Sequence, residues 1–192
     1  MKSNLFNSVL NRQSENRTDI WLKEQIKKII PINPRKDINS NRHLWESWPR
    51  QCKLYLFLYD PETKRKLKYY DTYPLVIPIT KKPVGKKNFT GINLHYLHPN
   101  LRENIVSFIF ENPITESEAR IRFNIDRFMR DNNKRDSTPI IKSYSYKNVK
   151  SHFLKIPENE YHLITSYPAD RFKKRHKSVV WQKTERRIRN GI

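Results

Sequence analysis

The chain has 192 residues, 36% of them hydrophobic and 12% aromatic, and its 39 Lys and Arg against 19 Asp and Glu give a formal net charge of +20. This length suits one domain with a single core and excludes two full-sized domains. The charge favours a polyanionic partner, nucleic acid first, while the aromatic content is too high for a wholly disordered chain.

The N-terminal region is expected to stand apart from the core. Residues 1–17 are polar, rich in Asn and without a hydrophobic period, which indicates an arm without regular structure. An amphipathic helix follows, because apolar residues recur at helical spacing until Pro31 stops it. Residues 31–50 carry prolines, asparagines and two tryptophans, so we expect an extended segment that lies over a partner.

Three runs in the middle of the chain predict neighbouring strands of an antiparallel meander over residues 54–97. Residues 54–59 are β-prone and end at an Asp-Pro turn. Residues 69–79 form a second run, whose two prolines favour an edge or bulged strand. After a basic turn at 83–88, alternation of side chains over 89–97 predicts the third strand.

Two amphipathic helices are expected to pack on this sheet. Asn100, with a glutamate three residues later, is a suitable cap for a helix over 100–112. Thr115 and Glu118 repeat that pattern before a helix over 115–130, where apolar residues recur at i, i+4, i+7 and i+8.

The last third of the chain is less regular. Residues 140–146 suit either a short strand or an irregular crossing, 151–156 a strand, and 158–165 a short helix. The stretch from Arg171 to the end is strongly basic and could become helical through Val180, Trp181 and Ile188.

Together these elements predict an α+β fold: a small antiparallel β-meander packed by two or three helices, with extended basic termini. We expect an N-terminal arm, helix and extended segment at 1–50, an α+β core domain at 51–168, and a basic C-terminal arm at 169–192.

The densest positive charge lies in the C-terminal stretch, where nine Lys or Arg accompany one acid, Glu185. Aromatic and apolar residues between the basic ones offer anchoring beside phosphate neutralisation, which predicts a nucleic-acid-binding arm. A solvated face, or a docking segment for an acidic protein, is the alternative. The predicted phosphate-binding residues are Arg171, Lys173, Lys174, Arg175, Lys177, Lys183, Arg186, Arg187 and Arg189.

The turns of the meander predict a second basic patch, because lysines gather where the strands end. Its members are Lys64, Arg65, Lys66, Lys68, Lys81, Lys82, Lys86 and Lys87. The predicted phosphate-binding residues among them are Lys64, Lys66, Lys82, Lys86 and Lys87. We expect both patches to neutralise DNA backbone phosphates, without sequence readout. The nearby Tyr69, Tyr70 and Tyr73 could stack on exposed bases, but tyrosines in strands more often pack in the core, and we favour the core.

Nothing in the pattern predicts catalysis or a cofactor. The carboxylates are scattered, and His95 and His98 have neither a third nearby ligand nor a cysteine partner, so no metal site is expected. A lone cysteine, Cys52, excludes an internal disulfide, and three glycines exclude a Gly-rich phosphate loop. A metal-dependent nuclease is the least favoured alternative.

A membrane partner is also not expected. The sequence has no run of 18 apolar residues, and its first ten residues lack the apolar core of a signal peptide. We therefore expect a cytosolic protein.

One block of the chain resembles virion proteins of T-even-type tailed phages. It reads LYDPETKRKLKYYDTYPLVIPI at 58–79 and FTGINLHYLHPNLR at 89–102. Several such proteins are described as DNA end protectors, head-associated proteins that shield the termini of packaged DNA from host exonuclease. The resemblance implies a virion protein that is made in the host cytoplasm, binds the packaged DNA terminus and is not an enzyme. The chain departs from these relatives at 81–87, which is rich in lysine where they have a short acidic or glycine turn.

A structural connector of the phage neck, tail or baseplate is the alternative. Its arms would wrap neighbouring virion subunits such as portal, neck or baseplate proteins, and would fold as they bind. Trp45 and Trp48 would then be the partner-binding anchors.

Overall fold

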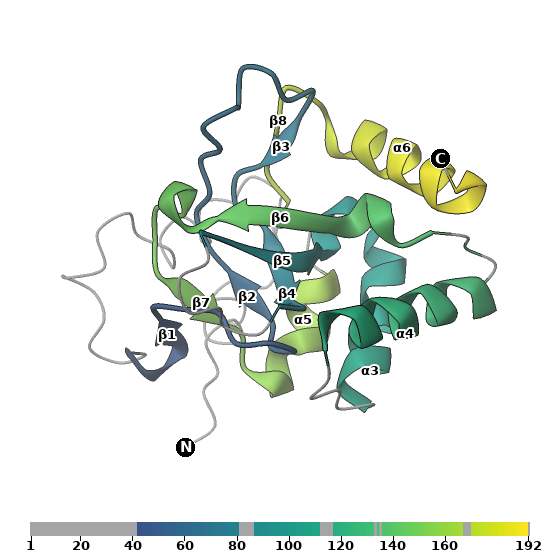
Figure 1. Cartoon of the computed structure of the whole chain (residues 1–192), viewed down its shortest axis with the longest axis horizontal. Coiled ribbons are helices and arrows are strands. Elements are labelled where there is room, and N and C mark those ends of the chain that lie inside the picture. The colour runs from purple at the N-terminus through teal and green to yellow at the C-terminus, as the bar shows by residue number, and fades with distance from the viewer. Residues whose placement is uncertain are drawn as a thin grey trace, which may run out of the picture.

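The structure is a computed structural model. It describes residues 42–80, 87–111, 117–132, 134, 136–166 and 170–191. The arm and helix expected before residue 42 lie outside the described residues, as do turn residues 81–86 with Lys82 and Lys86. Within the described ranges the fold is α+β, as predicted (Figure 1).

A six-stranded antiparallel sheet forms the centre of the molecule. In spatial order its strands are β1 (Trp45–Glu46), β7 (Phe153–Lys155), β2 (Tyr55–Leu56), β4 (Leu75–Pro78), β5 (Asn88–Asn93) and β6 (Ile141–Ser145). The predicted meander is confirmed as β2-β4-β5, whose neighbours pair antiparallel. The sheet is wider than expected, because β6 extends one side and β7 with β1 the other.

The observed strands differ from those expected in three details. Residues 69–79 form two strands, β3 (Tyr70–Asp71) and β4, and β3 belongs to a separate small sheet. The third strand ends at Asn93, because its side chain accepts a hydrogen bond from the His95 backbone N–H and starts the 3-10 turn Leu94–Tyr96. Residues 45–46, expected to lack regular structure, form β1 by pairing with β7.

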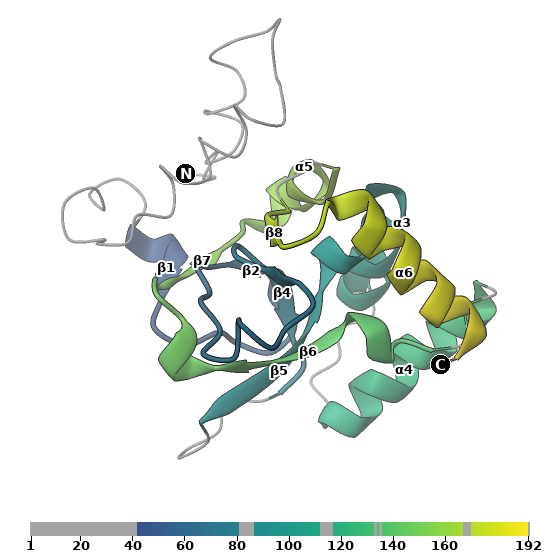
Figure 2. The same ribbon diagram turned by 90° about the horizontal axis from the view of Figure 1, so that it is seen from above.

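The two faces of the sheet carry different side chains. One face is mainly aliphatic and packs against the helices, which Figure 2 shows gathered on one side of the sheet. The other carries an aromatic cluster that includes Phe57, Phe89, Tyr144 and Phe153. The sheet curls around this cluster, since the rings of Phe153 in β7 and Phe89 in β5 lie 5.6 Å apart although β2 and β4 separate the two strands.

Four helices cover the aliphatic face in the described part of the chain. They are α3 (Pro99–Glu111), α4 (Glu118–Asp131), α5 (Tyr161–Ser166) and α6 (Lys177–Asn190). The first three match the expected helices closely, but the cap of α4 is Ser117, whose hydroxyl accepts from the Arg120 backbone N–H. The predicted cap Thr115 lies outside the described residues.

The C-terminal stretch, expected as a basic arm that could become helical through Val180, Trp181 and Ile188, is helical as that pattern indicated, but it packs on the core instead of forming a free arm. Val180, Thr184 and Ile188 recur at helical spacing in α6 and are at most 2% exposed. Gly191 ends the helix with a left-handed φ of 69°, and its N–H donates to the Arg187 carbonyl. The buried stripe explains the difference, because apolar contact fixes one face of the helix and leaves its basic side chains facing outward.

Candidate nucleic-acid interface

A two-stranded sheet joins the two basic segments that the sequence separates. Strand β3 pairs antiparallel with β8 (Phe172–Lys173), so that Tyr70 lies opposite Lys173. Strand β3 directly follows residues 60–68, here called the basic loop, which carries four exposed cations. These are Lys64, Arg65, Lys66 and Lys68. The basic loop and the first of the C-terminal basic residues therefore lie side by side (Figure 1).

Lys174 holds the basic loop against β8 through hydrogen bonds. Its backbone has a positive φ of 68°, and its Nζ donates to the carbonyl oxygens of Lys64, Arg65 and Leu67 at 2.6, 3.0 and 2.9 Å. An ammonium group has three hydrogens, and these contacts use all of them. Lys174 thus positions its neighbours and has no donor left for a phosphate.

The remaining predicted phosphate-binding residues fall into two groups. Arg171 lies over the ring of Tyr73 at 5.5 Å, and Lys177 lies over Trp181 at 5.7 Å, so both are half-buried. The exposed ones are Lys64, Lys66, Lys87, Lys173, Arg175, Lys183, Arg186, Arg187 and Arg189. Of these, Lys64 pairs with Asp60 and Arg189 with Glu185, both on the surface where such pairs are weak.

Buried polar contacts hold β8 and α6 to the core. Arg102 of α3 donates to Asp170 at 2.6 Å, with both side chains fully buried. The indole of Trp181 donates to the His95 carbonyl at 2.9 Å. The basic residues of β8 and α6 are therefore carried on fixed elements.

A second buried network centres on Asp71 at the start of the small sheet. Its Oδ2 accepts from His95 Nδ1 at 2.7 Å and from the Asn93 amide at 3.4 Å. Its Oδ1 accepts from the backbone N–H groups of Tyr73 and Arg171. One carboxylate thus connects β3, β5 and the segment before β8, and gives His95 a structural role.

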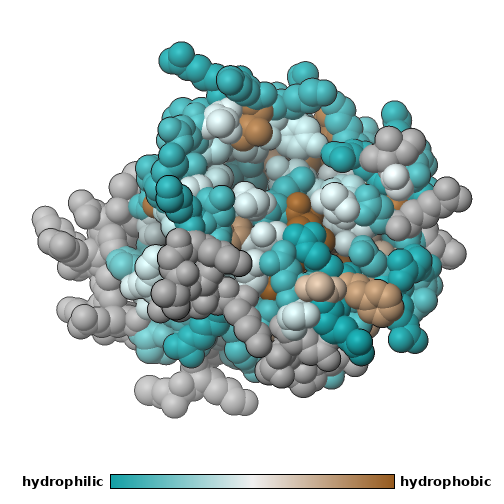
Figure 3. All heavy atoms as spheres, in the orientation of Figure 1, coloured by the Kyte–Doolittle hydropathy of each residue, from teal (hydrophilic) through white to brown (hydrophobic). Residues whose placement is uncertain are grey.

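Between the basic loop and β6 lies a cavity of about 390 Å³, here called the tyrosine cavity. Residues 59–70 form one wall, Lys142 and Tyr144 another, and Asp71, Asn93 and Tyr96 also line it. Figure 3 shows the surface hollowed above β6, with hydrophilic residues along the side formed by the basic loop. Tyr73 is buried in the core, as favoured, whereas Tyr69 and Tyr70 are half-buried in the cavity wall.

Lys142 places a cation inside this cavity. Its Nζ lies 4.1 Å from the centre of the Tyr96 ring. Burial, together with the smaller effect of the positive charge of Arg187, lowers the pKa of Lys142 to about 8. Sequence reasoning missed this residue, although a strand at 141–145 puts Lys142 on the same side as the buried Tyr144.

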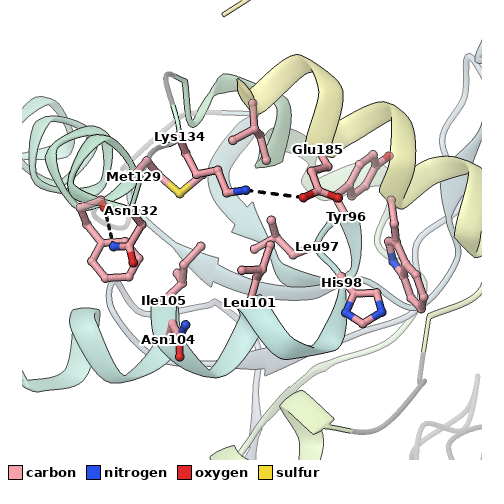
Figure 4. A pocket seen from close by; sticks show the side chains of 13 residues that line it. Tyr96, Leu97, His98, Leu101, Asn104, Ile105, Met129, Asn132, Lys134 and Glu185 are labelled. Carbon is pink, nitrogen blue, oxygen red and sulfur yellow. Dashed lines mark hydrogen bonds and ion pairs between the residues drawn. The ribbon is translucent and has the colours of Figure 1, made fainter. Parts of the chain in front are cut away.

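A second cavity, of about 240 Å³, lies among α3, α4 and α6 (Figure 4). Apolar side chains such as Leu101, Ile105 and Met129 line much of it. Lys134 and Glu185 point toward each other across it, 3.5 Å apart. Because this pair is neutral overall, the cavity offers no site for a polyanion.

The two tryptophans expected to anchor a partner differ in environment. Trp45 is half-buried in β1 and packs against the core. Trp48 is 45% exposed, with its ring edge-on to Tyr146 at 4.8 Å. Of the two, Trp48 is the more exposed.

The described ranges contain no group of three or more His, Cys, Asp or Glu side chains that could hold a metal ion. Every helix in those ranges is too short or too polar to cross a membrane.

Comparison with known proteins identifies a family. A family model described as the phage T4 terminal DNA protecting protein matches residues 3–187. No curated protein matches, and neither does any solved structure.

Proposed function

The chain belongs to the family of the phage T4 terminal DNA protecting protein, and from this membership we propose that it binds the ends of packaged phage DNA and protects them from exonuclease. The observation that carries the proposal is the pairing of β3 with β8. It joins the basic loop and the C-terminal basic residues into one positive surface.

Binding rests on backbone phosphates. The exposed Lys and Arg of the basic loop, β8 and α6 are long side chains on fixed elements, suited to neutralising phosphates on neighbouring turns of a duplex. Each phosphate neutralised contributes about 0.9 to the logarithmic dependence of affinity on salt. Affinity should therefore fall steeply as salt rises, with little dependence on base sequence.

Protection is steric in this proposal and requires no catalytic residue. A protein seated on the terminal base pairs keeps an exonuclease from the strand end for as long as it stays bound. The protein would act in the virion after synthesis in the host cytoplasm, with portal or neck proteins near it.

The test compares linear blunt-ended DNA with covalently closed circular DNA of the same sequence. Purified protein is titrated against both across a range of salt concentrations with magnesium present, and exonuclease digestion of the linear form is timed. We expect tighter binding to the linear form, slower digestion and no cleavage by the protein itself. Equal affinity for both forms would contradict end binding, and magnesium-dependent cleavage would indicate a nuclease.

A structural connector is the second candidate, favoured by the exposed ring of Trp48. Exposed aromatic residues are typical anchors of protein interfaces. In this case neither DNA form would bind at physiological salt, and Trp48→Ala would weaken attachment to a neck, tail or baseplate protein.

A further inference from the structure

The tyrosine cavity has a ring that is free to accept a ligand. Tyr59 packs edge-on against Tyr144 at 5.1 Å, and Tyr69 contacts Tyr96 at 6.0 Å. Tyr70 is half-buried, lines the cavity and makes no ring contact within the described part of the chain. A flat aromatic group entering the cavity could therefore stack on Tyr70 without displacing another ring.

The same cavity has a cation without an anion. Lys142 makes no ion pair within the described residues, and its charge rests on the face of Tyr96 alone. Asp71 also lines the cavity, but both of its oxygens already accept hydrogen bonds from the protein. A half-buried cation that has no ion-pair partner among the described residues favours a bound anion.

We propose that the tyrosine cavity holds the terminal nucleotide of a DNA strand, with its base stacked on Tyr70 and its phosphate on Lys142. The volume of about 390 Å³ lies in the range of small-molecule sites. Lys68, at the cavity and exposed in the basic loop, guides the preceding phosphate. This inference rests on the proposed function and deepens it.

The cavity explains how a surface that binds only phosphates can prefer ends. A base must leave its stack to enter, which is unfavourable inside a duplex and less so where pairing is already weakened. A terminal base has a stacked neighbour on one side only, so it enters at lower cost. Internal duplex would contact the basic surface alone.

The test uses Lys142→Gln and Tyr70→Leu, with Lys150→Gln as the matched control. Lys150 is exposed and does not line the cavity, so its replacement removes the same charge elsewhere. The probes are a blunt linear duplex and a closed circle of the same sequence, and circular dichroism checks the fold of each variant. We expect each cavity variant to lose roughly 5- to 150-fold in affinity for linear DNA, as for one lost base stack or charged contact, and to bind the circle as the parent does.

Three outcomes overturn the inference. If the parent prefers ends and both cavity variants keep that preference, end binding stands and the cavity is not its site. If Lys150→Gln loses as much affinity for linear DNA as Lys142→Gln does, the change in net charge explains the effect. If the parent binds both DNA forms alike, the proposed end binding and the cavity inference fall together.

Discussion

The buried pair of Arg102 and Asp170 is a single-residue contact on which the basic elements depend. Both side chains are fully buried, and one oxygen of Asp170 has no hydrogen-bond partner among the described residues. Arg102 also donates to the Leu97 carbonyl at 3.0 Å. The pair therefore ties α3 to the segment that leads into β8.

We expect Arg102→Leu to lower the free energy of unfolding by about 3–5 kcal/mol, because Asp170 is left buried without a counter-charge. Urea unfolding measures this. Arg122→Leu removes an exposed pair with Glu118 and should cost less than about 1 kcal/mol. Replacing Arg102 and Asp170 together by leucine should restore part of the loss, and equal losses for Arg102→Leu and Arg122→Leu would contradict this account.

Burying the charge of Lys142 lowers the stability of the fold, and the proposed contact with a phosphate requires that charge. Between pH 8 and 10.5 the unfolded chain holds a proton on this lysine that the folded chain lacks. Stability therefore rises with pH across this window, and the penalty of the buried charge is fully present below it. The charged groups around Lys142 are Arg187 on α6, Asp71 on β3 and Lys68 on the basic loop, with Tyr96 beneath it.

We expect Lys142→Met to raise the free energy of unfolding at pH 7 by about 1 kcal/mol, less than the full pKa shift implies because the side chain is only half-buried. The gain should shrink as pH approaches 10. Chemical denaturation at several pH values measures it. The same variant should lose preference for DNA ends, and a loss of stability at pH 7 would show that Lys142 serves packing.

At the scale of elements, Gly91 sets how closely β4 and β5 approach. A Cβ at this position would lie 2.9 Å from the carbonyl oxygen of Ile77 and closer still to Cγ1 of Val76. Backbone atoms in the middle of a sheet cannot move aside without disturbing neighbouring hydrogen bonds. The sheet therefore requires glycine here.

We expect Gly91→Ala to destabilise the protein by about 1–3 kcal/mol through overpacking. Thermal unfolding followed by circular dichroism measures the effect. Ser143→Ala, at an exposed position of β6, is a suitable control and should change stability little. A neutral Gly91→Ala would mean that β4 and β5 can separate at no cost.

The local pattern predicts elements, whereas long-range pairing decides how they combine. Runs of β-prone residues indicated β2 and β4, alternation indicated β5, and capping patterns indicated α3 and α4 within a few residues. The pairing of Trp45 with Leu154 could not be predicted, because the two residues lie more than a hundred positions apart and each strand is very short. Alternation continued past Asn93, but a local hydrogen bond from its side chain ended the strand there.

The sequence predicted that the candidate interface would be basic, but not where in the fold it would lie. Charge identified the basic loop and the C-terminal residues, and the pairing of Tyr70 with Lys173 then brought them together. Lys174 shows that counting charges alone does not identify the phosphate-binding residues, because its ammonium group donates its hydrogen bonds to backbone carbonyl oxygens of the protein. Lys142 was missed because one lysine in a five-residue strand does not stand out in a chain with 39 Lys and Arg.

At the scale of the whole molecule, the contribution of the net charge of +20 to DNA binding depends mainly on where the basic side chains are held. Helix α6 buries one stripe and exposes Lys183 and Arg186 to solvent. If DNA lies along this helix, both residues release counterions from the DNA. The same number of exposed lysines elsewhere should contribute less to the salt dependence of binding.

We expect the double variant Lys183→Gln with Arg186→Gln to reduce the slope of log affinity against log salt by about 1.8, two phosphates at about 0.9 each. Salt titrations with linear duplex measure the slope. Lys147→Gln with Lys150→Gln removes equal charge beyond β6 and should reduce the slope less. Identical slopes for the two double variants would mean that DNA does not lie along α6.

The small sheet also determines when the protein can first bind a polyanion. Asp71 and Arg171 are separated by 100 positions, so β8 is translated well after β3. Domains fold from the N-terminus as synthesis proceeds, but this surface needs both ends of that interval. A nascent chain therefore lacks the assembled surface until β8 has been synthesised. Messenger RNA, the polyanion closest to it during synthesis, meets the complete surface only after β8 has left the ribosome.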